Sequence, residues 1–371
     1  MTNPAYCSMI HGGLILDFEP AVPHAGPCCL RGSRSPVDIN TNFWNNANFV
    51  QLRELNKTGE WDPGCANCNI LEKAGHESMR TGMNRGLRLQ GQTDTTGPSR
   101  IDLSFDISCN LACRSCNAES STFWQKHLKE HGEWPYPVFT PKHKSNIIRA
   151  LEQLDLSNLQ QLVFCGGETL LGQEYWDVAR WLGDNVPNAK QQLTLGFQTN
   201  GTQEILERNY EIIEKFHLVK LNISLDGVGP RFEYLRWPAS WNQVTDNILY
   251  MKQHLPSNVM FLVEETISIF NLFYLDELDQ WVRENFATSR EGDVINHTQH
   301  LANGVFNLKN LSEEYRQAAL QTRWANLVPK HATDNTAAIK EMLAEIRKFD
   351  QYRNESFERT FPEIAQFYSK F

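Results

Sequence analysis

The pattern of apolar and polar positions changes near residue 95. Beyond it, short apolar or alternating segments, typical of strands, are separated by longer segments with apolar positions every three or four residues, typical of helices. We expect strands at residues 101–107, 159–164, 192–198, 218–225, 259–268 and 293–296, and helices at 118–130, 142–153, 173–184, 203–215, 241–254 and 275–284. This alternation predicts an α/β fold in which crossover helices connect parallel strands.

The segments on either side have other patterns. Residues 1–95 are rich in Gly, Pro and Asn, and have partly helical periodicity only around 43–61, which predicts a small loop-rich unit stapled by its cysteines. After residue 312, periodic charged and apolar positions predict helices at 313–325, 335–351 and 357–371. We therefore expect three parts, comprising residues 1–95, 96–300 and 301–371.

Composition narrows the classes of function. The net charge of −9 argues against general binding to nucleic acid or to a membrane surface, because either partner requires a concentrated basic face. The chain has no apolar run long enough to span a membrane and no signal-peptide pattern, so we expect a soluble, cytoplasmic protein. In such a chain of 371 residues, nine cysteines favour metal ligation over disulfides.

Three cysteines lie in a loop directly after the first expected strand. Three residues separate Cys109 from Cys113, and two separate Cys113 from Cys116. A structural zinc site normally has four ligands, whereas three thiolates leave a metal or an Fe–S cluster with one open position. The open position is where chemistry can take place.

This Cys-x3-Cys-x2-Cys loop resembles the signature of the radical S-adenosylmethionine (SAM) enzymes. The resemblance implies a partial (βα)6 TIM-like barrel in which Cys109, Cys113 and Cys116 hold a [4Fe–4S] cluster and SAM chelates the fourth iron. One departure is Ser115, where the family usually has an aromatic residue near the adenine. That departure weakens one SAM contact and leaves the cluster assignment intact.

Polar motifs follow the next three expected strands. Gly166 and Gly167 would let a ligand approach the backbone closely, and the Glu168 carboxylate can accept hydrogen bonds from an ammonium group. Alone, Gly-Gly-Glu usually marks a turn. By the resemblance, it holds the SAM amino group, and the ribose and methionine carboxylate are contacted by Thr199, Asn200, Ser224 and Arg236. An arginine on a helix is by default a solvated or ion-paired group, but its guanidinium also suits a carboxylate.

The remaining cysteines suggest a second site in the first 95 residues. A Cys65-x2-Cys68 pair with two more distant cysteines would suit a four-thiolate site for zinc or for Fe–S, and spacing alone does not choose the metal. The segment resembles the SPASM/twitch auxiliary-cluster modules, which usually follow the barrel. The resemblance implies an auxiliary [4Fe–4S] cluster on Cys7, Cys28, Cys65 and Cys68, with Cys29 spare and competing with Cys28.

The resemblance also implies the reaction. An electron donor such as flavodoxin or ferredoxin would reduce the first cluster, SAM would be cleaved, and a 5′-deoxyadenosyl radical would take a hydrogen atom from the substrate. A four-thiolate auxiliary cluster has no open iron, so we expect an electron relay. If Cys29 were the only thiol within reach of the radical, it could instead donate a hydrogen atom.

The sequence leaves three hypotheses about the function open. The first is modification of a peptide or protein, as in most SPASM/twitch relatives. The second is oxidation or rearrangement of a small metabolite, which gains weight because we find no separate N-terminal peptide-binding domain. The third is a non-enzymatic binding protein stapled by zinc.

Overall fold

The structure is a computed structural model. It describes the whole chain apart from residues 1–2, 20–21, 32–33, 74–76, 87–92, 94, 140–143, 287–297, 303 and 330–334.

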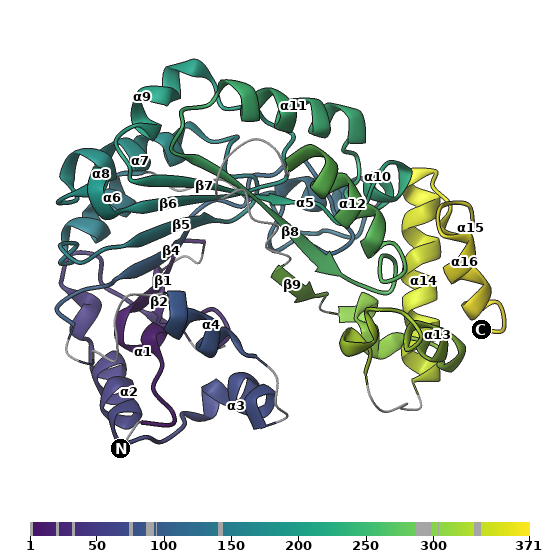
Figure 1. Cartoon of the computed structure of the whole chain (residues 1–371), viewed down its shortest axis with the longest axis horizontal. Coiled ribbons are helices and arrows are strands. Elements are labelled where there is room, and N and C mark those ends of the chain that lie inside the picture. Colours follow the sequence, from purple (N-terminus) through teal and green to yellow (C-terminus); the bar gives the residue numbers. More distant parts are fainter. Residues whose placement is uncertain are drawn as a thin grey trace.

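A curved nine-stranded sheet forms the centre of the described part of the chain, in the order β3-β2-β1-β4-β5-β6-β7-β8-β9 (Figure 1). From β1 to β9 along this order all neighbours are parallel, while β2 and β3 form an antiparallel edge. The strands are β1 Gly13–Asp17, β2 His24–Gly26, β3 Ser35–Pro36, β4 Arg100–Ser104, β5 Gln161–Cys165, β6 Thr194–Thr199, β7 Leu218–Ser224, β8 Val259–Ile267 and β9 Thr298–Leu301. The α/β fold class and the parallel sheet expected from the sequence are confirmed.

Helices connect the parallel strands and lie along the outer face of the curved sheet (Figure 1). They are α5 Thr122–Glu130, α6 Lys144–Glu152, α7 Gln173–Asn185, α8 Ala189–Gln192, α9 Tyr210–Ile213, α10 Pro230–Leu235, α11 Trp241–His254 and α12 Leu275–Phe286. No helix in the described residues is long and apolar enough to cross a membrane.

One row of apolar side chains crosses the sheet and forms the centre of the main core. The strand register aligns Leu16, Leu103, Phe164, Phe197, Leu221 and Phe261, each at most 1% exposed. Strand neighbours point to opposite faces, so the other face carries mostly polar residues, including Ser104, Cys165, Gln198 and Asn222. The inner face of the partial barrel is therefore suited to bind a polar ligand, whereas the face with the apolar row packs into the core.

The first 95 residues contribute more regular structure than their composition suggests. They contain α1 Ser8–Gly12, α2 Ala47–Lys57, α3 Ala66–Lys73 and α4 Met79–Gly86, besides β1, β2 and β3. Strand β1 pairs in parallel with β4, so the sheet continues across the expected boundary at residue 95. The sequence pattern did not reveal β1, because all five of its residues are buried and no alternation marks it.

The C-terminal segment forms a second core against the end of β8. Helices α13 Glu313–Ala319, α14 Thr336–Arg353, α15 Phe357–Thr360 and α16 Pro362–Ala365 contribute buried residues such as Tyr315 and Phe357. The single helix expected at 357–371 is wrong, since Pro362 has no backbone N–H and starts a new helical turn.

Of two further expectations, one is not tested by the structure and the other is largely wrong. The strand expected at 293–296 lies outside the described residues, and the last described strand is β9. The helix expected at 203–215 is largely wrong, because only Tyr210–Ile213 forms an α-helix. The Asn200 side chain accepts from the Thr202 backbone N–H at 2.9 Å, and this local bond favours a turn over a helix start.

Replacing Leu16 with Ala tests whether β1 belongs to the main core. Leu16 is fully buried, so we expect a loss of about 3 kcal/mol in the free energy of unfolding. Val22 is 51% exposed, so Val22→Ala should change it by less than about 0.5 kcal/mol. Denaturant unfolding followed by circular dichroism measures both, and equal effects would contradict the placement of β1.

Candidate cluster and cofactor site

The Cys109–Cys116 loop follows β4 at the carboxyl edge of the sheet. Cys113 is buried, and Cys109 and Cys116 are partly buried. Backbone hydrogen bonds tie the loop to the end of α10 and to the segment after it. Arg114 N–H donates to the Leu235 carbonyl at 2.7 Å, and Ala112 N–H donates to the Trp237 carbonyl at 2.8 Å. The loop is thus held in a fixed shape by parts of the chain more than 100 residues away.

The three thiols of the loop lie close enough to influence one another. Burial raises the pKa of Cys109 to about 11, of Cys113 to about 12 and of Cys116 to about 11, and in each case a neighbouring loop cysteine raises it further. Three thiolates could share this space only with a positive group between or beside them. Their donor set therefore suits an Fe–S cluster with one open position.

The Gly-Gly-Glu segment packs directly against the backbone of this loop. Gly167 N–H donates to the Asp106 carbonyl at 3.0 Å, and Glu168 N–H donates to the Ser108 carbonyl at 2.8 Å. A Cβ atom on Gly167 would lie 2.2 Å from the Ser108 carbonyl oxygen. Only glycine permits this approach, so the two segments form one unit at the sheet edge.

Glu168 joins the second and third strand ends. Its buried carboxylate accepts from Thr199 Oγ1 at 2.7 Å, from Asn200 N–H at 2.6 Å and from Leu170 N–H at 3.0 Å. Burial raises the pKa of Glu168, while these donors lower it. Because a carboxylate has about four acceptor positions, one remains for a further donor. Three of the residues expected to bind SAM are therefore in contact with one another.

Arg236 is buried beside the cluster loop. Its Nη2 forms an ion pair with Asp226 Oδ2 at 2.8 Å, and its Nη1 lies 3.9 Å from Cys113 Sγ. Its Nε is buried and has no hydrogen-bond partner among the described residues. Asp226, which is 2% exposed, was not singled out from the sequence, although its position just after a strand is a usable signal.

Asn200 and Ser224, which were both expected to bind SAM, have different surroundings. Asn200 reaches the loop directly, since its Nδ2 lies 3.8 Å from Cys109 Sγ and 3.0 Å from Asn110 Oδ1. Ser224 ends β7 on the same sheet edge, where it is in register with Glu264 of β8. Glu264 in turn accepts a hydrogen bond from Gln198, so polar groups from three strands line the inner face here.

Comparison with known proteins identifies the domain around this loop. Residues 106–271 match the family model described as Radical SAM superfamily. This part of the chain resembles a radical SAM superfamily domain. The match spans less than half of the chain, and it supports an enzymatic activity of this domain. No curated protein matches the chain.

Solved structures with low sequence identity were also found. One is native anSMEcpe with bound AdoMet and Cp18Cys peptide, with 16% identity, a TM-score of 0.39, and an alignment covering 60% of this chain and 60% of that one. Another is SuiB from Streptococcus suis, with 11% identity, a TM-score of 0.37, and coverage of 94% and 73%. A SuiB structure bound to the precursor peptide SuiA has 12% identity, a TM-score of 0.38, and coverage of 95% and 74%. This chain thus spans less than two thirds of the length of anSMEcpe.

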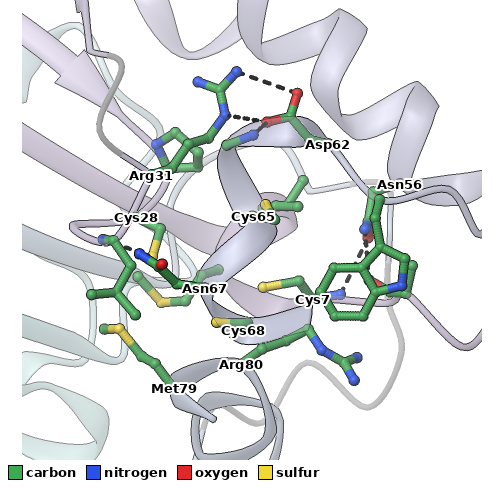
Figure 2. A pocket seen from close by; sticks show the side chains of 17 residues that line it. Cys7, Cys28, Arg31, Asn56, Asp62, Cys65, Asn67, Cys68, Met79 and Arg80 are labelled. Carbon is green, nitrogen blue, oxygen red and sulfur yellow. Dashed lines mark hydrogen bonds and ion pairs between the residues drawn. The ribbon is translucent and has the colours of Figure 1, made fainter. Parts of the chain in front are cut away.

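A second group of thiols lies outside the radical SAM domain. Figure 2 shows the side chains of Cys7, Cys28, Cys65 and Cys68 around one pocket, with their sulfurs turned toward a common space. Cys7 precedes α1, Cys28 follows β2, Cys65 ends the 3-10 helix Pro63–Cys65 and Cys68 lies in the first turn of α3. The four cysteines that the sequence resemblance grouped together are therefore neighbours in space.

Cys28 and Cys29 are adjacent in the chain but differ in position. Cys28 lines the pocket, whereas Cys29 is exposed and its Sγ lies 3.7 Å from Met79 Sδ. The Cys29 thiol donates toward Cys28, which lowers the pKa of Cys28 to about 6, while burial raises the pKa of Cys7 to about 12 and of Cys65 to about 11. Position and pKa both favour Cys28 over Cys29 as a ligand in this pocket.

Neither group of thiols is arranged for a single ion. Among the described residues, no set of three or more His, Cys, Asp or Glu side chains is placed as the ligands of one metal ion. An Fe–S cluster is larger than one ion and is bound by thiolates that lie further apart.

Replacing Gly167 with Ala tests the contact between the Gly-Gly-Glu segment and the cluster loop. The added Cβ would meet backbone atoms of Ile107 and Ser108, so we expect a loss of about 3 kcal/mol in the free energy of unfolding. Gly82 of α4 is the matched control, because a Cβ there meets nothing within 4 Å. Gly82→Ala should stabilise by up to about 1 kcal/mol. Denaturant unfolding of both variants measures this, and a neutral Gly167→Ala would contradict the close approach.

Proposed function

We propose that the protein is a radical SAM enzyme that modifies a peptide or protein by abstracting a hydrogen atom from it. The proposal rests on one observation: three thiols lie close to Glu168, Asn200 and Arg236 at one edge of the sheet. This edge belongs to the part of the chain that matches the radical SAM superfamily. When bound, a [4Fe–4S] cluster and SAM would together supply a 5′-deoxyadenosyl radical there.

Different residues of the site would bind the cluster and SAM. Cys109, Cys113 and Cys116 would hold the cluster through three irons and leave one iron open. The free acceptor position of Glu168 suits the ammonium group of SAM, and the close packing of Gly167 on Ser108 holds this carboxylate beside the loop. The expected contacts of Thr199, Asn200 and Ser224 with SAM remain predictions.

Arg236 fits a role toward the methionine carboxylate of SAM in one respect. Its Nε is a buried donor without a partner among the described contacts, and a buried donor normally has one. Its two other nitrogens face Asp226 and Cys113. The guanidinium can therefore hold a carboxylate and the cluster loop in a fixed relation.

The second group of thiols supports an auxiliary cluster. Four thiolates from Cys7, Cys28, Cys65 and Cys68 would complete all positions of a [4Fe–4S] cluster, so its part would be to relay electrons and not to bind substrate. Electrons for the loop cluster would come from a small redox protein such as a flavodoxin or ferredoxin. The polar inner face of the sheet would receive the reacting group of the substrate.

Anaerobic reconstitution with iron and sulfide tests the proposal. We expect a brown protein with about eight irons that converts SAM to 5′-deoxyadenosine under reducing conditions. Replacing Cys109, Cys113 and Cys116 with Ala should leave about four irons and abolish this conversion. Cys165→Ala is the control, because that thiol belongs to neither group, and it should keep about eight irons.

Other outcomes of the same experiment would count against parts of the proposal. A colourless protein with stoichiometric zinc would support a zinc-stapled binding protein and contradict the radical mechanism. Loss of all iron from the triple variant would contradict an independent N-terminal cluster. A structure with SAM then separates the substrate classes, because a long groove toward C5′ suits a peptide and a closed polar pocket suits a metabolite.

A further inference from the structure

The C-terminal helix α14 ends against the loop that carries the three radical SAM cysteines. Arg353, the last residue of α14, is 8% exposed, and its Nη2 donates to the Ala112 carbonyl at 3.0 Å. Ala112 directly precedes Cys113 in the chain. In Figure 1, α14 lies beside α10, whose following residues also hold the loop. A residue far from the radical SAM motif thus reaches the backbone of the cluster loop.

A second arginine, from the loop itself, fixes the end of this helix. Arg114 Nη2 forms ion pairs with Asp350 at 2.7 Å and with Glu355 at 2.8 Å, and its guanidinium lies 3.7 Å from the centre of the Tyr234 ring. Arg114 and Arg353 therefore form reciprocal contacts, one from the loop to the helix and one from the helix to the loop. This double connection holds the Arg353 guanidinium at a constant position.

The surroundings of Arg353 leave its charge without a direct counter-ion. The rings of Trp124, Trp237 and Phe349 lie 4.7, 4.8 and 5.0 Å from the guanidinium carbon, and Nε lies 3.5 Å from the imidazole Nε2 of His127. In the described part of the chain, no carboxylate forms an ion pair with Arg353, and its Nη1 has no hydrogen-bond partner. A buried cation of this kind is costly unless a nearby anion offsets it.

Two groups that can carry a negative charge act on Arg353 through space, first the carboxylate of Glu355, which lies 2.8 Å from Arg114, and then the thiol of Cys113. Burial lowers the pKa of Arg353 only to about 10, so the guanidinium stays charged at neutral pH. Its charge also acts on Cys113, one of the expected cluster ligands, as that of Arg236 does more strongly. Arg236 is neutralised by Asp226 at 2.8 Å, whereas Arg353 has no such partner among the described residues. Arg114 faces two carboxylates, those of Asp350 and Glu355, so Arg353 supplies the second positive charge on this side of the loop.

We propose that Arg353 is a positioning residue of the radical site, whose buried positive charge stabilises the reduced form of the cluster held by Cys109, Cys113 and Cys116. The inference rests on the proposed function. Reduction adds one negative charge to the cluster, and net charge, hydrogen bonds and solvent exposure set the potential of such a cluster. In a site of low dielectric, a fixed cation favours the more negative state. The C-terminal extension would thereby make electron transfer to the cluster easier.

A potentiometric titration of the whole reconstituted protein tests this role, with the loop cluster followed by the part of the electron paramagnetic resonance spectrum that responds to SAM. Arg353→Gln should lower the equilibrium constant for reduction at least about tenfold, a shift of about 59 mV to lower potential for one electron. Arg353→Lys keeps the charge and should restore most of the shift. Arg347→Gln removes a charge from the exposed side of the same helix and should leave the potential unchanged.

Glu355→Gln provides a second test in case the Arg353 variants do not fold. It removes a negative charge beside Arg114 with little change of shape, so the potential should move in the opposite direction, to higher values. With normal iron content, an unchanged potential in Arg353→Gln would overturn the inference and leave the proposed function standing. If Arg353→Gln does not fold, an unchanged potential in Glu355→Gln overturns it. Absence of iron from the loop of the unaltered protein would contradict the proposed function itself.

Discussion

Mutual repulsion among the three thiolates of the cluster loop is the constraint on which the arrangement at the sheet edge depends. Burial raises the pKa of Cys109, Cys113 and Cys116, and a neighbouring loop cysteine raises each of them further. Such a group is stable only when positive charge and donors surround it. Arg236, which is paired with Asp226, and Arg353 bring guanidinium groups to this loop from separate parts of the chain. The ionic contacts of the radical SAM domain and of the C-terminal helices meet at this loop for that reason.

The sheet supplies the geometry that this loop needs. A continuous apolar row from Leu16 to Phe261 anchors six strands to the outer helices, and the opposite face stays polar. Parallel strands bring their carboxyl ends to one edge, so loops distant in sequence become neighbours. Glu168 then links two of these loops through Thr199 and Asn200. The binding site is thus formed by short loops that are distant in the sequence and that the order of the strands brings together.

Much of this could be predicted from the sequence, because the signals are local. Strands β4 to β8 follow from alternation, and the cysteine spacing marks the loop. Other features depend on contacts across the chain, and no pattern reveals them. All five residues of strand β1 are buried and show no alternation. The pairing of Arg236 with Asp226 and the approach of Arg353 to Ala112 join separate elements. The preference for Cys28 over Cys29 also needed the position of each sulfur in space.

The central claim is that the chain holds two chemically different thiolate sites, one open at the Cys109–Cys116 loop and one closed around Cys7, Cys28, Cys65 and Cys68. Titration of the chemically reduced, iron-loaded protein with SAM, followed by electron paramagnetic resonance, tests it most directly. The account predicts that the signal of one cluster shifts on saturation with SAM while the signal of the other stays unchanged. A spectrum in which neither signal responds, or in which both respond, would contradict it.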